Sequence, residues 1–211
     1  MTEHQTMNTV IHAAFRRDLG RFDTALGAFP AGSQPRADEL ARAWDNFEYQ
    51  LRHHHDDEET IFWPALRELG AGEAMMGELG GEHETMLGSL DGAAAAMHQL
   101  HLNPSADNAA AARSAIADLR TNVADHLAHE ERDLEPLAAA QVKSPQMKAA
   151  QRAVRKSAKG KAGTFFAWLQ DGADADARAA LRRDVPPPVL FVITKLGGRQ
   201  YRNEIAPVWA A

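Results

Sequence analysis

The chain has 211 residues, of which 45% are hydrophobic and 25% charged, a composition typical of a folded globular protein. Its formal net charge of −6 argues against general nucleic-acid binding, so we expect no nucleic-acid partner. There is no cysteine, which excludes disulfides, thiolate metal sites and a cysteine nucleophile. Any bound metal must therefore use nitrogen and oxygen ligands.

The first residues, MTEHQTMNTVIHAAF, lack the basic-then-apolar layout of a secretory signal. The longest apolar stretch lies around Val189 to Thr194 and is far shorter than the roughly 20 residues that a membrane span needs. The absence of cysteine also fits a reducing compartment. We therefore expect a cytoplasmic protein with no membrane partner.

Breaks rich in glycine, proline and small polar residues divide the first two thirds of the chain into segments with helical periodicity. Because the connections are short, sequential helices should be antiparallel neighbours. The sequence predicts an all-α fold: an antiparallel up-down four-helix bundle over residues 1–143. The breaks lie at Phe29–Pro35, Gly70–Gly72, Asn103–Ser105 and Ser144–Pro145.

The four segments carry apolar residues at steps of three and four, the pattern of one buried helix face. The first face runs from Phe15 to Phe29 and the second from Leu40 to Leu51, continuing at Ile61 and Ala65. The third runs from Met76 to Met97 and the fourth from Ile116 to Leu137. We expect these faces to form the core.

Residues 144–211 differ in character and predict a helical C-terminal extension packed on the bundle. A fifth helix is expected from Pro145 to about Gln170, ending in aromatic residues. A short helix rich in Ala, Asp and Arg, the run Pro186-Pro187-Pro188 and an apolar tail follow. The extension is too small for a large separate core.

Polar residues interrupt the apolar faces at positions that should point into the bundle. An isolated imidazole or carboxylate is costly there unless it is paired or bound to metal. Counting residues from each break places them at about the same level of an antiparallel bundle. The six residues are His12, His54, Glu58, His83, His126 and Glu130.

Two of the segments also repeat each other: His54 to Pro64 matches His126 to Pro136 at His, at two consecutive Glu residues and at Pro. A His and a Glu four residues apart share one helix face. Two such pairs, with further histidines from the other helices, suit a dinuclear iron or manganese site better than zinc. A ferritin-like centre would instead need Glu-x-x-His pairs.

This set of residues, with the HHxxxEE…FWP style of its second segment, resembles the hemerythrin-like (HHE cation-binding) family over about residues 5–140. Together with the C-terminal extension, this pattern is similar to hemerythrin-like proteins of actinobacteria. The resemblance implies that the six residues bind two iron ions joined by an oxo or hydroxo bridge, with Glu58 and Glu130 bridging them. Manganese or zinc are alternative metals.

The chain departs from the oxygen-carrying members, which have a second histidine one turn after the third-helix ligand. Here that position is Leu87, and the fourth-helix carboxylate is Glu130 at a spacing of four rather than an Asp at five. One ligand fewer predicts an open coordination position. The resemblance therefore implies redox chemistry, with catalase-like decomposition of hydrogen peroxide or a stress-related reaction as the first hypothesis.

Two other functions are retained as alternatives. One is a module that binds O2, NO or iron for sensing or storage without turnover, signalling through the extension. The other is a bundle with a single zinc or nickel ion. We assign no catalytic residue beyond the metal ligands, and we expect a monomer or weak dimer.

The residues next to these six are expected to lie outside the metal site. We expect His53, His55 and His129 to face away from the site, although a shift of register would exchange His54 for His53 or His55. Glu59 and Glu131 should be exposed or hydrogen-bonded to ligand imidazoles. Tyr49 is expected to pack in the core.

Overall fold

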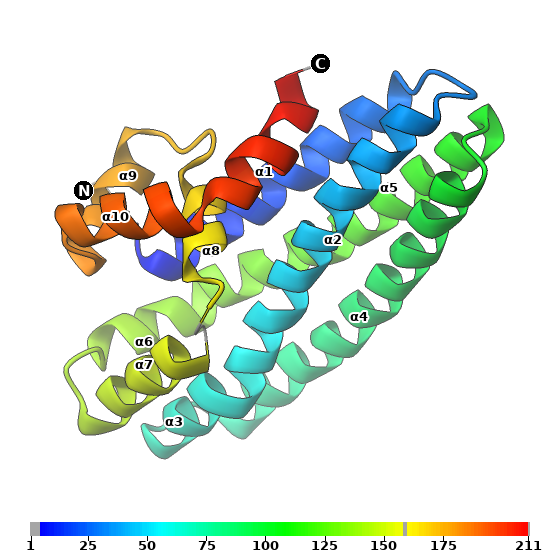
Figure 1. Ribbon diagram of the computed structural model, residues 1–211. Coiled ribbons are helices and arrows are strands. Elements are labelled where there is room, and N and C mark those ends of the chain that lie inside the picture. The colour runs from blue at the N-terminus through cyan, green and yellow to red at the C-terminus, as the bar shows by residue number, and fades with distance from the viewer. Residues whose placement is uncertain (1–4, 158–159, 211) are drawn as a thin grey trace.

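The computed structural model describes residues 5–157 and 160–210, and every regular element in these ranges is helical (Figure 1). This confirms the all-α prediction. The long helices are α1 (Met7–Gly27), α2 (Gln34–Asp57), α4 (Glu73–Leu102) and α5 (Ala106–His129). The shorter elements are η1 (Glu58–Phe62), α3 (Trp63–Glu68), η2 (Glu130–Leu134), α6 (Glu135–Ala140), α7 (Pro145–Ser157), α8 (Ala162–Gln170), α9 (Ala175–Asp184), α10 (Pro187–Gly197), η3 (Tyr201–Ile205) and η4 (Ala206–Ala210).

The breaks in the sequence end and begin the long helices. Thr6 caps α1, Ser33 caps α2 and Ser105 caps α5, each accepting a hydrogen bond from a backbone N–H of the first turn. Gly32 and Gly70 adopt positive φ values of 82° and 99° in the turns. The chain can therefore reverse direction within a few residues at each of these points.

The four long helices pack in the pairs α1–α2, α2–α4, α4–α5 and α1–α5 (Figure 1). Their facing sides form one apolar core, which includes Phe15, Leu51, Leu90 and Val123. Most residues of the predicted apolar faces are buried there. The burial of large side chains from all four helices is the main source of stability for this arrangement.

Two turns of π-helix, η1 and η2, follow α2 and α5 and begin at Glu58 and Glu130. In each, the residue after the turn donates its N–H to the Glu carbonyl oxygen five residues earlier: Trp63 to Glu58 and Glu135 to Glu130. A proline comes next, and its ring would clash with the carbonyl group four residues before it in a regular α-helix. The wider turn relieves this clash.

The first wide turn corrects the predicted core of the second segment. Ile61 and Ala65 were expected to be buried, but Trp63 and Leu66 take those places and Ile61 and Ala65 are only half-buried. A π turn holds more residues per turn than an α turn, so it delays the return of the buried face along the chain. A strict α-helical period could not anticipate this shift.

The predicted fifth helix from Pro145 to Gln170 is wrong as a continuous element. It divides into α7 and α8 around Gly160, whose φ of 93° is incompatible with a helix. Residues 158 and 159 lie outside the described range. The predicted short helix is α9, and the apolar run after the three prolines forms α10.

The C-terminal helices pack on α1 through a buried polar cluster. The indole Nε1 of Trp168 donates to the Asp18 carboxylate at 2.7 Å, and the Trp168 ring lies 5.2 Å from Phe15 between centroids. Arg21 pairs with Asp171 at 2.8 Å, and the Tyr201 hydroxyl donates to the same carboxylate. These contacts join the extension to the core, while the division at residue 143 stays a prediction.

Among the described residues, no helix combines the length and the apolar character needed to cross a membrane.

Candidate metal centre

Seven buried or nearly buried side chains converge between α1, α2, α4 and α5. They form two groups, in each of which one ligand atom per residue lies within 4.8 Å of the others. Glu58 belongs to both groups. The first group is His55, Glu58, His83 and His126, and the second is His12, His54, Glu58 and Glu130.

The two carboxylate oxygens of Glu58 face different groups. Oε1 lies 3.1 Å from His54 Nε2, whereas Oε2 lies 3.7 Å from His83 Nε2 and 4.0 Å from His55 Nε2. The Nε2 atoms of His83 and His126 are 3.1 Å apart. A carboxylate with one oxygen toward each of two sets of imidazoles has the orientation of a bridging ligand.

Glu130 also lies between the two sets. Its Oε2 atom is 3.4 Å from His12 Nε2 and 3.8 Å from His126 Nε2. Because Glu58 and Glu130 each begin a π turn, both carboxylates project from equivalent points of the repeated sequence. Short π segments are frequent at functional sites.

Carboxylates from neighbouring positions hold three of the imidazoles from outside. Nδ1 of His12 lies 2.9 Å from Glu131, Nδ1 of His83 lies 2.8 Å from Glu59, and Nδ1 of His126 lies 3.1 Å from Glu82. An ionised carboxylate only accepts, so each Nδ1 carries the proton and each Nε2 presents a lone pair to the centre. Nδ1 of His55 is oriented in the same way, by the Leu51 carbonyl oxygen at 2.8 Å.

The inward-facing atoms are left without hydrogen bonds. Among the described residues, Nε2 of His12, His54 and His55, Oε2 of Glu58 and both carboxylate oxygens of Glu130 are buried and have no hydrogen-bond partner. Buried polar atoms are normally satisfied, and here six unsatisfied ones share one small space. Their donor set of imidazole nitrogens and carboxylate oxygens fits iron, manganese or zinc. A cation in each of the two groups would satisfy them.

The electrostatic environment shifts the pKa values of the two carboxylates in opposite directions. Burial raises the pKa of Glu58 well above its usual value, and the nearby charge of Glu130 adds to this effect. Burial also opposes ionisation of Glu130, but the nearby imidazoles of His12, His126 and His54 together outweigh burial and lower the Glu130 pKa to about 2. Burial lowers the pKa of His54, His55 and His83, which favours the neutral imidazoles that metal binding requires.

The six residues singled out from the sequence all lie in this cluster, and the structure adds a seventh. His55 was expected to face away, but it is buried, and its ring centroid lies 4.5 Å from that of His83. The spacing could have revealed it, since His55 follows Leu51 by four residues and precedes Glu58 by three. This spacing fits the buried face as well as that of His54 does.

Some expectations for the residues around the cluster are confirmed and others are wrong. Glu59 and Glu131 do contact imidazoles, as predicted. Glu82 was not identified from the sequence. Its carboxylate lies near His126 and also lies 2.7 Å from Nδ1 of His129, and only its position next to His83 hinted at this role. Tyr49 is not a core residue, since its ring lies beside His53 and under the Lys161 ammonium.

The fold and the cluster define a class of protein: an all-helical domain with a buried histidine and glutamate cation site between its long helices. The model of the hemerythrin HHE cation-binding domain matches residues 9–138, which is more than half of the chain. The chain belongs to this family. No curated protein and no solved structure matches it.

Proposed function

We propose that this chain is a non-haem di-iron protein that reacts with hydrogen peroxide or related oxidants. His55, His83 and His126 would hold one iron ion, His12 and His54 the other, and Glu58 and Glu130 would bridge them. The proposal includes an antiparallel up-down four-helix bundle, a cytoplasmic location and a monomer or weak dimer. Manganese or zinc could occupy the same donors.

The position of Glu58 carries this proposal. Its two oxygens face separate sets of imidazoles, at 3.1 Å from His54 and 3.7 Å from His83. A site for a single ion would need only one of the two groups. The buried atoms without hydrogen-bond partners support the same conclusion, because they lie on both sides of Glu58.

The two halves of the cluster offer unequal numbers of imidazoles. Three histidines surround one position, and only His12 and His54 face the other. The second position thus keeps more room for a small molecule. A bound iron pair would supply the electrons for reduction and oxidation of peroxide.

The surrounding residues would confine and orient this chemistry. Phe15, fully buried, lies 5.4 Å from His54 between ring centroids and covers this side of the cluster with apolar surface. Glu131, Glu59 and Glu82 hold the Nδ1 protons, so the imidazoles keep Nε2 directed inward.

The test is metal analysis followed by an assay with peroxide. Iron-loaded full-length protein should contain about two irons per chain, show the absorption of a bridged pair and evolve O2 from hydrogen peroxide. One zinc and no iron per chain would overturn the di-iron proposal. Two irons without O2 evolution would overturn the peroxide reaction alone.

A second function, binding of O2 or NO without turnover, is favoured by His55. The open position expected from Leu87 is partly filled, because His55 from α2 brings a third imidazole to His83 and His126. Reversible spectral changes when O2 or NO is added and removed, without O2 evolution from peroxide, would support this function over the first. If ligand binding also changed proteolysis of residues 145–211, a sensor would be indicated.

A further inference from the structure

Helix α10 presents an apolar strip to solvent. Six large hydrophobic side chains are exposed among the described residues, and four of them lie within eight residues on this helix. They are Val189 (46% exposed), Phe191 (62%), Val192 (51%) and Leu196 (69%). Val189, Val192 and Leu196 follow at steps of three and four along one side of the helix, and Phe191 widens this strip next to Val192. A contiguous exposed apolar face of this kind marks an interaction site.

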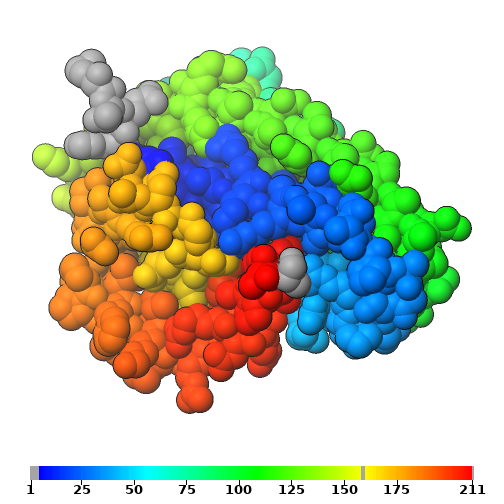
Figure 2. All heavy atoms as spheres, turned by 90° about the horizontal axis from the view of Figure 1, so that it is seen from above, coloured from blue at the N-terminus to red at the C-terminus, as the bar shows by residue number. Residues whose placement is uncertain are grey.

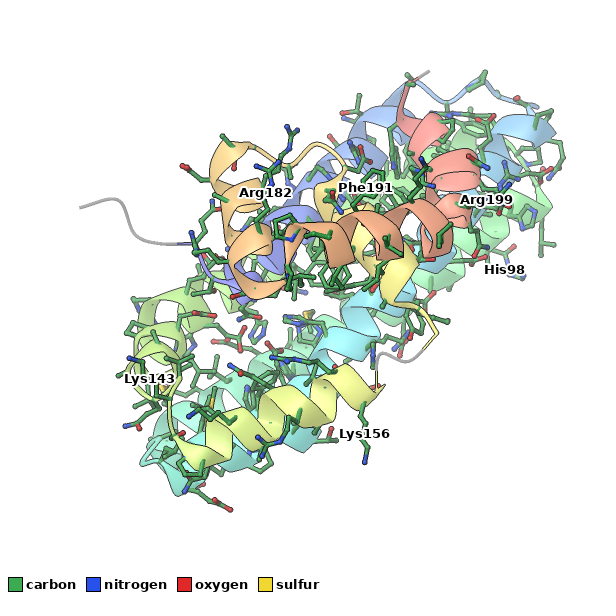
Figure 3. All side chains as sticks on the ribbon, turned by 60° about the vertical axis from the view of Figure 1, so that its left-hand side comes forward. His98, Lys143, Lys156, Arg182, Phe191 and Arg199 are labelled. Atoms are coloured by element: carbon green, nitrogen blue, oxygen red, sulfur yellow. The ribbon has the colours of Figure 1, made fainter. Side chains whose placement is uncertain are left out.

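Cationic residues flank this apolar strip at both ends. Arg182 and Arg183 precede it in the last turn of α9, and Lys195 and Arg199 lie at its other end, all four exposed. In the view of Figure 3, Phe191 lies between Arg182 and Arg199. The Lys195 ammonium also lies 5.3 Å from the Phe191 ring centroid.

Acidic residues are few in this region, although the whole chain is acidic. Helix α10 contains none. Residues 175–210 carry six Lys and Arg against three Asp and Glu, whereas the chain has a net charge of −6. Residues 175–210 thus carry a net positive charge around the exposed apolar strip, as α7 does elsewhere, whereas residues 1–143 carry 24 Asp and Glu against 11 Lys and Arg.

The strip points away from the bundle on a firmly held helix. In Figure 2, the orange and red atoms of α10 and the following segment form the edge of the molecule opposite the green atoms of α4 and α5. Leu190 anchors the inner face of α10 in the core. Gly163 of α8 and Gly197 touch so closely that a Cβ on Gly163 would overlap the Gly197 backbone.

We propose that α10 binds the surface of an anionic lipid membrane, with its apolar strip at the level of the acyl chains and its flanking cations at the headgroups. An amphipathic helix lying in the interface combines these two features. Anionic lipid attracts each nearby Lys or Arg, and apolar side chains gain by leaving water. The chain would lie on the membrane surface without crossing it.

The same features disfavour a second copy of the chain as the occupant. A strip one helix wide and about 16 Å long is far smaller than the roughly 800 Å² that each partner buries in a stable interface. Symmetric pairing of two α10 helices would also bring cations together, because Lys195 and Arg199 would lie near the same residues in a parallel pair and near the Arg182 and Arg183 end in an antiparallel pair. Like charges at a two-fold contact oppose association.

Sedimentation of the full-length protein with vesicles tests this proposal. Vesicles of phosphatidylcholine with about 30% phosphatidylserine, a composition chosen to give a surface potential, should bind the protein at low salt and release it at high salt. Neutral phosphatidylcholine vesicles should bind it more weakly. The double variant Phe191→Ser, Leu196→Ser should lower the partition coefficient by about tenfold or more.

Matched controls separate the strip from general effects. Leu102→Ser removes an equally exposed side chain (64%) from the end of α4 and should leave binding unchanged. Lys195→Gln with Arg199→Gln should lower binding to anionic vesicles by about tenfold, whereas Lys148→Gln with Arg152→Gln on α7 should have little effect.

Several outcomes would overturn the proposal. The protein could bind neither kind of vesicle, or Leu102→Ser could lower binding as much as Phe191→Ser with Leu196→Ser does. Equal binding to neutral and anionic vesicles would also contradict the proposal. A wild-type dimer in light scattering that Phe191→Ser, Leu196→Ser dissociates would assign the strip to a second copy. None of these measurements depends on the metal centre, so the two proposals fail separately.

Discussion

The two repeated units of the centre, His54 to Pro64 and His126 to Pro136, share a backbone but differ in what they supply. Each places Glu at the start of a π turn and Pro at the start of the next helix. One residue after the His, however, the first unit has His55 and the second has Leu127, a buried core residue. The repeat thus fixes the placement of the two buried carboxylates, and a single position decides the number of imidazoles in the cluster.

The carboxylates of the two units also differ because their neighbours come from other helices. Burial opposes the ionisation of Glu130 and Glu131, but His12 of α1 lies beside both, and with His126 near Glu130 and Arg16 near Glu131 it lowers the pKa of each to about 2. Burial dominates at Glu58 and raises its pKa. Equivalent positions in a repeat can therefore have opposite electrostatics.

The largest effect is expected for Glu58→Gln, which keeps the shape and removes the charge shared by both groups. Affinity for both metal positions should fall by more than about 100-fold. Loss of a residue that only hydrogen-bonds a ligand costs up to about 100-fold, and the loss of a direct ligand should cost more. Iron per chain after dialysis measures this. Glu68→Gln, an exposed change on α3, is the control, and retention of one tightly bound iron in Glu58→Gln would contradict a shared role.

Next in size, His55→Leu makes the first unit like the second. We expect the iron content to fall from about two to about one per chain, because only the position shared with His83 and His126 loses an imidazole. His53→Leu, a change of the half-exposed neighbour, should keep both ions. If His55→Leu binds two irons with an unchanged absorption spectrum, His55 is not a ligand.

Smaller effects should follow from the outer carboxylates of the two units. Glu131→Gln weakens the anchor of His12 and removes the ion pair with Arg16 at 2.6 Å, so metal affinity should fall by roughly 10- to 100-fold. Glu59→Gln should lie at the lower end of that range, since Glu59 is more exposed. Competition with a chelator ranks the two variants, and the reverse order would contradict this account.

The smallest effect on the centre is expected for Trp168→Phe. Trp168 of the extension packs on Phe15, which in turn lies beside His54 of the first unit, so this change tests how the extension is attached to the core. The change leaves the buried Asp18 carboxylate without its indole donor and should lower the free energy of unfolding by about 1–3 kcal/mol. For a chain of this size each kcal/mol lowers Tm by roughly 2–4 °C. Metal content should stay the same.

Trp209→Phe is the matched control for that measurement. The Trp209 indole Nε1 is buried and has no hydrogen-bond partner among the described residues, although its ring packs 5.0 Å from Phe22. Its loss should therefore cost less stability. Equal shifts of Tm in the two variants would mean that packing, rather than the bond to Asp18, secures the extension.

The sequence was sufficient to predict the long helices, since glycine, proline and capping residues mark their ends and apolar spacing marks their faces. It also located His12, Glu58 and the other interrupting polar residues, because burial of such groups demands a partner. His55 was missed since the match with the second unit pointed to His54, while periodicity allowed both.

Other features have causes that a fixed helical period does not include, two of them local and one between distant segments. The π turn that moves burial from Ile61 and Ala65 to Trp63 and Leu66 follows from the proline beyond it, a local cause that a fixed period ignores. The break at Gly160 could have been read from the glycine itself. Glu82 reaches His126 and His129 across helices, and no spacing within α4 indicates this.

The shared carboxylate of Glu58 has a consequence for how metal binding is titrated. In the proposed site for two ions, an ion on either side would fix the carboxylate for the other, so the two binding steps would be coupled rather than independent. By thermodynamic linkage, the factor by which the first ion changes the affinity for the second is the same in whichever order they bind. A binding isotherm of this protein should therefore be fitted with one coupling constant, which substitution of Glu58 would reduce toward unity.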